Sequence, residues 1–459
     1  MKHEETIAGR MARWFHASHD RGPFAAGPQG RALAQMAVAD TLGCMYASRN
    51  DNVVRAVASV AGAPGDAWLV TGGTADSAMA AMVNGTAAHA LDYDDNFGPG
   101  MSHASAVILP ALLAVCDISR PGRDLIDAYL VALQAQAFVG AGMGPGHYAA
   151  GWHGTSTVGS VGTAAGVAHL LGADTDGLRR ALTLACSFAC GTKGQFGTPA
   201  KPFHAGLAAR NAVEAARLAL AGIEGSPIAL EGPQGFSHMF RGPNMPGYDP
   251  HEIEATDRNV IETDGVVPKL HPCCGSTHLI IDAIADLRGQ HDFCADAVRS
   301  IDVRVGIANL RNLPYTLPEN EMQARFSMNY CVAVALREGH LTLQDFTPEA
   351  VRARRGDPLL SCLTMTSWTA EEEAAADGAR LPHQVTLRLA SGQTYRAERL
   401  FARGDLRDPF PDDAMRAKFM ACCDEAPWAK GLHDWLMVLD LAPDLRQFAL
   451  LFGRSDGPR

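Results

Sequence analysis

A long succession of alanine-rich apolar segments, interrupted by glycine, proline or aspartate, fills the first half of the chain. Their apolar residues recur at helical spacing, and the interruptions carry residues typical of helix ends. Gly172, for example, follows one segment, and Asp174 can cap the next, which begins at Thr175. The clearest segments are 31–47, 77–90, 105–117, 124–142, 158–171, 175–190 and 205–221. The sequence therefore predicts an all-helical body.

The pattern changes after Val267, where strand-like stretches appear. Residues 300–307 alternate apolar and charged side chains, and residues 383–400 suggest two strands around a Ser391-Gly392 turn. Predicted helices lie among these strands at 276–287, 321–337 and 347–355, and helical pattern returns at 414–423 and 432–438. Strands mixed with helices indicate an α+β unit within the second half.

The length of 459 residues also favours two domains, because a single hydrophobic core rarely organises so long a chain. We expect a mainly α fold with a large all-helical domain, made of residues 1–266 and 410–459. Residues 267–409 are expected to form the smaller α+β domain. Two domains imply a cleft between them, which is the expected place for a site.

The composition excludes several classes of function. With 47% hydrophobic and 19% charged residues, and no run of about 18 apolar residues, the chain resembles a globular protein without membrane spans. The net charge of -11 argues against a nucleic-acid partner. The first thirty residues do not look like a secretory signal, and the eleven scattered cysteines do not suggest a disulfide framework. We expect a cytoplasmic protein whose few cation clusters bind an anionic small molecule.

Three carboxylates crowd the end of one predicted helix, at Asp92, Asp94 and Asp95, and a Gly/Pro loop leads from them to His103. Like charges this close raise the pKa of one member, which suits proton transfer near neutrality. A solvated helix end with one capping aspartate is the alternative interpretation. The spacing does not fit an EF-hand calcium loop.

A second polar set occupies residues 146–157, with Tyr148, His153 and Thr155 among its members. Its hydroxyl residues can cap the helix expected from Val158, and free N–H groups at a helix start suit an anion. The alternative is that these side chains only pack the loop against the helical body.

A third set places Lys201 between Pro199 and Pro202, three residues before His204 and just ahead of a predicted helix. Prolines leave the backbone few alternatives, so the ammonium group can be fixed as a clamp for a carboxylate. A plain surface charge is the alternative interpretation.

The fourth set opens the predicted α+β domain with Lys269, His271, Cys273, Cys274 and His278. Its spacing matches neither paired Cys-x2-Cys units nor His-Glu-x-x-His, so no metal is expected there. We expect Lys269 and His271 to line the cleft. The chain also lacks the motifs of serine hydrolases, P-loop enzymes and dinucleotide-binding folds.

In this order, the four sets resemble the signatures of the MmgE/PrpD family over nearly the whole chain. The resemblance rests on residues 84–95, Gly151-Trp152-His153, Lys201-Pro-Phe-His204-Ala-Gly206 and Lys269 with Pro272. It implies a helical domain built from both chain ends, a lid formed by the α+β domain, a homodimer, and an active site between the domains without metal or organic cofactor.

By matching motif positions, the resemblance places five residues in that active site: Asp92, His103, His153, Lys201 and Lys269. It also implies chemistry on small di- or tricarboxylates. Where decarboxylases of the family have a histidine shortly after the lid lysine, this chain has Cys274, and their lid tyrosine is replaced near Asn309 or Leu310. The loops around His147-Tyr148 and His153 look closer to the family's epimerases.

These observations lead to the prediction of a lyase, specifically a hydro-lyase similar to 2-methylcitrate dehydratase. His153 and His103 are expected to transfer protons, with the lysines holding carboxylates and Asp92 orienting or charge-balancing an imidazole. The remaining predicted substrate-binding residues are Tyr148, Thr155, His204 and His271. Two alternatives remain open: an epimerase similar to iminodisuccinate epimerase, and a catalytically silent carboxylate-binding protein.

Overall fold

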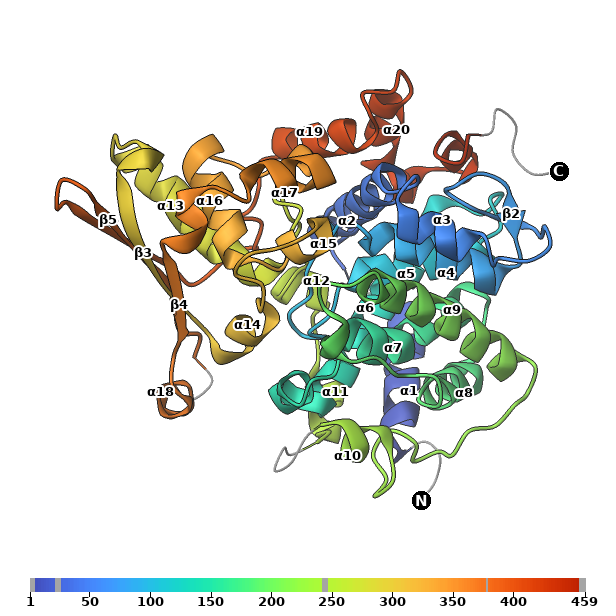
Figure 1. Ribbon diagram of the computed structural model, residues 1–459. Helices are drawn as coiled ribbons and strands as arrows, with labels where there is room; N and C mark the ends of the chain where they lie inside the picture. The colour runs from blue at the N-terminus through green and yellow to red at the C-terminus, as the bar shows by residue number, and fades with distance from the viewer. Residues whose placement is uncertain (1–4, 21–25, 242–246, 377–378, 454–459) are drawn as a thin grey trace.

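The computed structural model describes residues 5–20, 26–241, 247–376 and 379–453, and the fold is mainly helical (Figure 1). A helical body forms the right side of this view, and a smaller α+β part forms the left side. The helices of the body before residue 221 are α1 (Ile7–Asp20), α2 (Pro28–Ala47), α3 (Asn52–Ala58), α4 (Ser77–His89), α5 (Ala104–Val115), α6 (Gly122–Ala149), α7 (Gly154–Leu170), α8 (Thr175–Ala185) and α9 (Ala200–Leu220). Short elements complete it: β1 (Ala67–Trp68), β2 (Thr74–Ala75), α10 (Phe236–Phe240), α11 (Pro250–Ala255) and α12 (Val260–Thr263).

Local capping explains where several of these helices begin and end. The Asp76 carboxylate accepts hydrogen bonds from the N–H groups of Ala78 and Met79, which starts α4. Asp174 accepts from the Gly177 N–H at 2.7 Å and starts α8, as the sequence predicts. Gly172, with φ of +81°, follows the end of α7 and permits the reversal.

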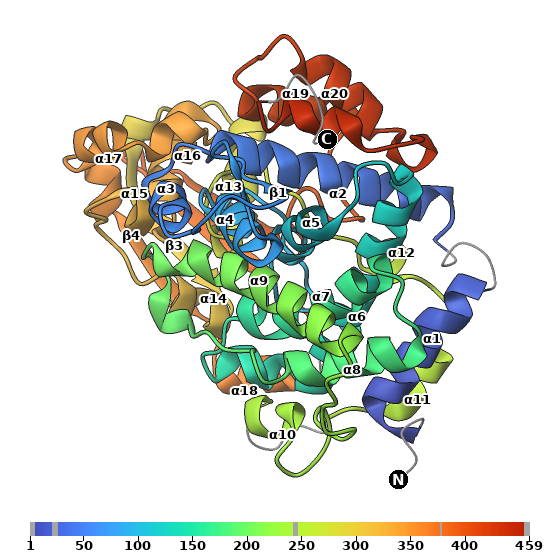
Figure 2. The same ribbon diagram turned by 90° about the vertical axis from the view of Figure 1, so that its right-hand side faces the viewer.

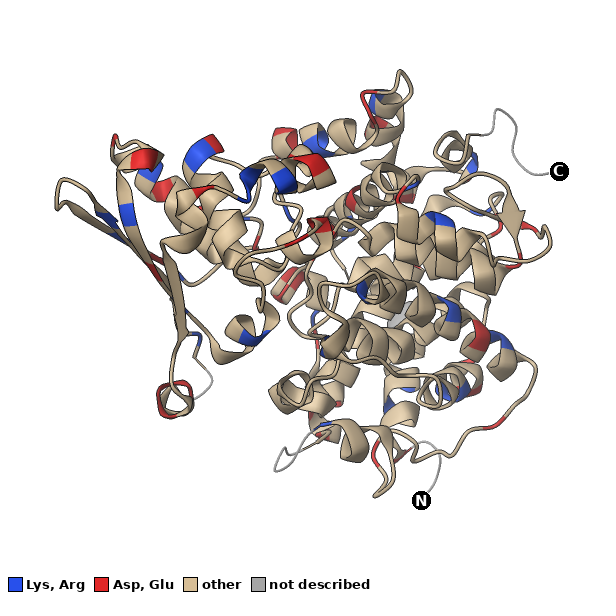
Figure 3. Ribbon diagram, viewed as in Figure 1, with Lys and Arg blue, Asp and Glu red and all other residues tan. Residues whose placement is uncertain are grey.

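The central helices are uncharged and closely packed. Helices α4, α5 and α7 contain no Asp, Glu, Lys or Arg, and Figure 3 shows them without charged positions. A Cβ atom on Gly206 of α9 would lie only 2.1 Å from the Met82 carbonyl oxygen of α4, so glycine is required at this crossing. This close approach brings the C-terminal end of α4 near the start of α9.

The C-terminal segment packs back on the helical body. Helices α19 (Asp412–Cys422) and α20 (Ala429–Leu436) lie over α2 in both ribbon views (Figure 2). Lys418 of α19 forms a buried ion pair with Asp40 of α2, at 2.6 Å, and donates a hydrogen bond to the Tyr93 carbonyl oxygen at 2.7 Å. Both ends of the chain therefore contribute to one hydrophobic core.

The α+β part is built around a four-stranded sheet in the order β4-β3-β5-β6. Its strands are β3 (Val298–Val305), β4 (Leu363–Ser367), β5 (His383–Leu389) and β6 (Thr394–Arg399). Strand β3 is parallel to β4 and antiparallel to β5, which is antiparallel to β6. The alternation expected for 300–307 is confirmed, because Ile301, Val303 and Val305 are buried. The α+β part has a hydrophobic core of its own. Its helices are α13 (His278–Gln290), α14 (Ile307–Asn312), α15 (Glu321–Ala324), α16 (Met328–Glu338), α17 (Pro348–Arg354) and α18 (Ala370–Ala375).

Three predicted boundaries next to the polar sets are wrong. Helix α6 continues to Ala149 past a break at Gly144, whose φ is +59°, so Tyr148 lies on a helix rather than in a loop. Helices α7 and α9 begin earlier than expected, at Gly154 and Ala200. Pro202 is tolerated in the first turn of α9 because the first N–H groups of a helix have no partner within it.

One helix in the described part of the chain, α6, is long and apolar enough to cross a membrane. However, 94% of its most apolar window is buried inside the fold. Core helices commonly meet the same criteria, so α6 is weak evidence for a membrane span.

Candidate active site

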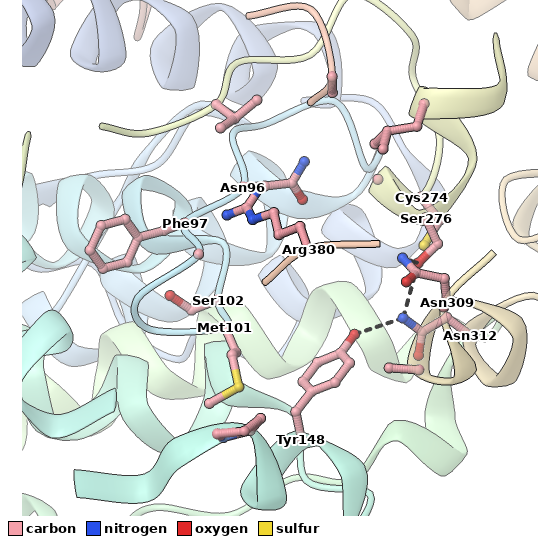
Figure 4. A pocket seen from close by; sticks show the side chains of 18 of the residues that line it. Asn96, Phe97, Met101, Ser102, Tyr148, Cys274, Ser276, Asn309, Asn312 and Arg380 are labelled. Carbon is pink, nitrogen blue, oxygen red and sulfur yellow. Dashed lines mark hydrogen bonds between the residues drawn. The ribbon is translucent and has the colours of Figure 1, made fainter. Parts of the chain in front are cut away.

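A cavity of about 680 Å³ lies where the helical body meets the α+β part. The helical body contributes His103, Tyr148, His153 and Lys201 to its wall. The α+β part contributes a second set, which includes Cys274, Ser276, Asn309, Asn312 and Arg380 (Figure 4). A volume of this size suits a small molecule enclosed by both parts.

Asp92 lies behind this wall, held by two lysines. It follows the end of α4 with φ of +49°, an unusual backbone conformation for a residue other than glycine. Its Oδ2 accepts from Lys201 Nζ at 2.6 Å and its Oδ1 from Lys269 Nζ at 2.5 Å. Burial alone would raise the pKa of Asp92, but the two ammonium groups overcome that effect and hold its pKa well below the ordinary value.

Asp94 is the carboxylate that meets the imidazoles. The His89 Nδ1 lies 2.9 Å from Asp94 Oδ1, and the His103 Nδ1 lies 3.5 Å from Asp94 Oδ2. Burial again opposes ionisation, but these histidines lower the pKa of Asp94. The prediction that Asp92 orients an imidazole is therefore wrong, since its oxygens accept hydrogen bonds from the two lysines. That it balances the charge of an imidazole stays a prediction, because one of its oxygens lies within 4.8 Å of a ring nitrogen of His89 and of His103.

The Nδ1 atom of His103 is hydrogen-bonded to the Asp95 carbonyl oxygen, 2.8 Å away. A carbonyl oxygen only accepts hydrogen bonds, so neutral His103 carries its proton on Nδ1 and leaves a lone pair on Nε2. Burial, followed by the charges of His89 and Lys269, lowers the pKa of His103 well below its ordinary value. At neutral pH His103 is therefore an uncharged proton acceptor on the cavity wall.

His153 directly precedes the first residue of α7 and lines the cavity. Its Nδ1 lies 3.1 Å from His204 Nδ1, while its buried Nε2 has no hydrogen-bond partner among the described residues. Burial first, and then the Lys201 charge, lowers the pKa of His153 well below the ordinary value. Burial and the charge of His89 also lower the pKa of His204 to about 4.

The third carboxylate of the acidic turn lies beneath the site. Asp95 contacts the Ser105 hydroxyl, which in turn lies 2.7 Å from the Tyr129 hydroxyl. Burial raises the pKa of Asp95 to about 7, although the Ser105 hydrogen bond opposes the shift. The crowding predicted from the sequence thus leaves Asp92 and Asp94 ionised, and the raised pKa belongs to Asp95.

The sequence was compared with known protein families and with known proteins. Residues 27–249 match the MmgE/PrpD N-terminal domain, and residues 271–430 match the MmgE/PrpD C-terminal domain. The chain belongs to the MmgE/PrpD family. It is 26% identical to cis-aconitate decarboxylase of Mus musculus over 393 residues, which cover 83% of this chain and 78% of the relative. It is 25% identical to cis-aconitate decarboxylase of Aspergillus terreus, covering 80% and 79% of the two chains. It is also 27% identical to the cis-aconitate decarboxylase-like protein oryM of Aspergillus oryzae, covering 74% of each chain.

In this MmgE/PrpD protein, the predicted site residues separate into a cavity wall and a supporting layer. Tyr148 lines the wall, and its hydroxyl accepts a hydrogen bond from Asn312 Nδ2 at 2.9 Å (Figure 4). Thr155 supports His103, because its Oγ1 accepts from the His103 backbone N–H at 3.0 Å. His204 is also in the supporting layer, where it contacts His153 rather than the cavity.

Two predicted substrate-binding residues occupy positions that do not fit direct binding. Lys269 is fully buried outside the cavity wall, and it donates to both the carboxylate and the carbonyl oxygen of Asp92. His271 lies away from the cavity, with Nε2 3.7 Å from Asp282 Oδ1. We therefore assign Lys269 to positioning Asp92, and His271 to the interior of the α+β part.

Sequence reasoning missed His89 and Arg380 as site residues, and it named Asp94 only as one member of the acidic cluster. The five-residue separation of His89 and Asp94 across a helix end was the available signal, but it does not reveal which carboxylate turns inward. Arg380 precedes a strand in a stretch without any motif, so only the fold brings it to the cavity. The cluster with metal-binding geometry is also unexpected: one ring nitrogen each of His89, His103 and His153 lie within 4.8 Å of one another.

Proposed function

We propose that this MmgE/PrpD protein is a lyase that removes a proton beside a carboxylate of a small di- or tricarboxylate. The supporting observation is the pair of uncharged imidazoles, His103 and His153, beside the Lys201 ammonium on one cavity wall. An ammonium group can bind the substrate carboxylate and stabilise the negative charge that develops when the neighbouring C–H bond breaks. An uncharged imidazole can accept that proton.

His103 is the proposed base, because its hydrogen bond to the Asp95 carbonyl leaves a lone pair on Nε2. Lys201 is the proposed carboxylate ligand: only one of its three donors is used by Asp92, at 2.6 Å. His153 is the proposed acid, with His204 setting its tautomer through their 3.1 Å contact. In the tautomer that accepts from His204, His153 carries its proton on Nε2 and can donate it.

The proposed reaction is elimination of water, as in a hydro-lyase. His103 takes the proton from carbon, and the electron pair of the C–H bond becomes the second bond of the alkene. The C–O bond breaks, and the leaving hydroxyl takes a proton from His153 and departs as water. The proton on His103 then returns to His153 through solvent, which restores the starting state.

Decarboxylation is the second candidate, because the relatives described above are named cis-aconitate decarboxylases. Against it stands Cys274, which lines the cavity where the family's decarboxylases have a histidine. Epimerisation would require proton acceptors on two faces of one carbon. The lid role of the α+β part belongs to the same proposal, since that part closes one side of the cavity.

The test is a panel of citrate-like and aconitate-like acids followed by NMR in deuterated water. We expect an alkene signal from a hydroxy acid. Loss of a carboxylate carbon would favour decarboxylation, and C–H exchange without an alkene would favour epimerisation. Thermal stabilisation by these acids without turnover of any would indicate a silent binding protein. Near-normal turnover by both folded His153→Ala and Lys201→Ala variants would overturn the site assignment.

We also propose, from the family resemblance, that the protein is a cytoplasmic homodimer. Light scattering coupled to size-exclusion chromatography should give twice the chain mass of 48.7 kDa. A mass equal to one chain at micromolar concentration would contradict the dimer.

A further inference from the structure

Three histidines from three separate segments converge at the cavity wall, where His103 and His153 line the cavity and His89 lies behind them. His89 ends α4, His103 precedes α5 and His153 precedes α7. Their ring centroids are 4.2 Å apart for His89 and His103, 6.2 Å for His89 and His153, and 6.3 Å for His103 and His153. One ring nitrogen of each lies within 4.8 Å of the others, a spacing at which a single ion can be shared.

Each ring is already oriented through its Nδ1 atom. His89 Nδ1 contacts the Asp94 carboxylate at 2.9 Å, His103 Nδ1 contacts the Asp95 carbonyl at 2.8 Å, and His153 Nδ1 contacts His204. Metal-binding histidines are typically fixed in this way by a carboxylate or carbonyl on the nitrogen that does not bind the metal. These contacts leave Nε2 of His89 and His103 for a ligand, and also Nε2 of His153 in the tautomer whose Nδ1–H donates to His204.

Two of these Nε2 atoms are buried without a partner. Among the described residues, neither His89 Nε2 nor His153 Nε2 has a hydrogen bond. Such orphaned polar atoms are uncommon in folded proteins and point to a group that binds there. His103 and His153 also line the cavity, so an ion can enter from it and keep a coordination position open toward it.

The charges around the three rings are balanced rather than repulsive. Asp92 and Asp94 supply two carboxylates near the histidines, while Lys201 and Lys269 supply two ammonium groups. The two carboxylates therefore offset the two ammonium groups beside the three rings.

We propose that His89, His103 and His153 form a binding site for one divalent transition-metal ion of the Zn²⁺ class. Three imidazoles and one open position suit Zn²⁺ or Co²⁺ rather than Mg²⁺ or Ca²⁺, which prefer oxygen ligands. The bound ion occupies the Nε2 lone pair of His103 and inhibits turnover, a consequence that rests on the proposed function.

Binding is tested on the full chain with Co²⁺, whose visible absorption intensifies in a tetrahedral nitrogen site. We expect one Co²⁺ per chain, displaced by one Zn²⁺. Calorimetry should give the same stoichiometry for Zn²⁺, with no binding of Mg²⁺. The absence of a tetrahedral spectrum and of one-to-one Zn²⁺ binding in the unaltered protein would overturn the site, whatever the protein's activity.

Substitutions at and beside the three histidines test whether the ion binds there. His89→Gln removes a ligand that is outside the cavity wall, and Asp94→Asn removes the partner that orients it. We expect Zn²⁺ affinity to fall at least about tenfold in each. His433→Gln is the matched control, a buried histidine on α20 that should leave the affinity unchanged. Folding of each is checked by thermal melting; equal affinities in folded His89→Gln and His433→Gln would contradict the site.

Turnover separates this inference from the proposed function. Zn²⁺ should inhibit competitively with substrate, and a chelator should restore the rate. Tight one-to-one binding without any effect on turnover would contradict the claim that the ion takes the lone pair of His103. Metal binding by a protein that turns over no carboxylate would instead overturn the proposed function and leave the site standing.

Discussion

Asp92 depends on two buried cations, and the cost of removing one can be measured. Lys269→Met leaves Asp92 with Lys201 alone and deprives the Asp92 carbonyl oxygen of its donor. Removing one member of a buried ion pair typically destabilises a protein by about 3–5 kcal/mol, because the remaining charge stays buried. We expect the free energy of unfolding in urea to fall by about this amount.

Arg416→Met provides the control for that measurement. Arg416 and Asp434 form an ion pair with partly exposed side chains, at 39% and 54% exposure. Exposed pairs contribute about 0–1 kcal/mol. If Lys269→Met lowered the free energy of unfolding no more than Arg416→Met does, Asp92 would not need its second lysine.

The raised pKa of Asp95 predicts a pH dependence of stability opposite in sign to that of its neighbours Asp92 and Asp94, whose pKa values are lowered. Burial raises its pKa to about 7, so the folded state binds more protons than the unfolded state between about pH 4 and 7. The contribution of Asp95 to stability therefore falls as pH rises through that window. Asp95→Asn, which mimics the protonated form, should remove this loss, on the order of 4 kcal/mol in total.

The measurement is the difference between the unfolding free energies of the unaltered protein and Asp95→Asn across that pH range. Histidines with lowered pKa values, such as His204, give stability that rises with pH in the same window, but they are common to both proteins. A flat difference curve would show that Asp95 titrates normally.

At the scale of elements, the crossing of α4 and α9 sets the distance between Asp92 and Lys201. Gly206→Ala would place a Cβ atom 2.1 Å from the Met82 carbonyl oxygen and 2.3 Å from Thr86 Oγ1, so the helices must separate. Overpacking of this kind costs about 1–3 kcal/mol. We expect that loss in urea unfolding, together with a lower kcat, because Lys201 moves with its helix.

Gly431→Ala is the matched control for Gly206→Ala, since a Cβ there would meet nothing within 4 Å. Alanine is favoured over glycine inside helices by about 0.5–1 kcal/mol, so this variant should be neutral or more stable. We expect the free energy of unfolding to fall in Gly206→Ala and to stay unchanged or rise in Gly431→Ala. A Gly206→Ala protein as stable as the unaltered one would mean that the crossing can relax.

The sequence predicted most of the helices and strands, but it predicted only part of the candidate active site. Apolar spacing in 77–90 and 175–190 located α4 and α8. For α8 the capping residue, Asp174, was an additional local signal in the sequence. The start of α9 was missed, since a proline in a first turn resembles a loop. The short strand β4 also escaped prediction, because all five of its residues are only partly buried or exposed.

Within the site, motif positions located Asp92, His103, His153 and Lys201 in sequence, and the fold brings them together. Which carboxylate faces which cation was not predictable, because it depends on the left-handed backbone at Asp92. The three-histidine cluster was not predictable either. Its members lie at three elements far apart in the sequence, and no short metal-binding spacing connects them.

At the scale of the whole molecule, the cavity requires both parts of the chain. Arg380 reaches across it from the α+β part, and its Nη2 would lie 3.9 Å from a Cβ at Gly98 of the helical body. A guanidinium group there can bind a second carboxylate of the substrate. Arg380→Met should raise KM about tenfold, or ~1.4 kcal/mol, with a smaller change in kcat.

Arg388→Met is the control for Arg380→Met, because Arg388 is exposed on β5 and contacts Asp302 instead of the cavity. Steady-state kinetics with a tricarboxylate and with the matching dicarboxylate sharpen the comparison. The defect should be larger for the substrate with the additional carboxylate. Equal KM values for Arg380→Met and the unaltered protein would place that carboxylate elsewhere.

The return of α19 to the helical body has a consequence for how the protein is made. Lys418 supplies both the partner of Asp40 and the donor to the Tyr93 carbonyl, next to Asp92. Helices α4 to α9 leave the ribosome long before α19 does, and domains tend to fold as they emerge. The acidic turn and Asp40 therefore lack their contacts with Lys418 until α19 has been synthesised. More than half of the chain is made in that interval. A nascent chain stopped before residue 412 should be recognised by chaperones as unfinished, even though most of its helices are already present.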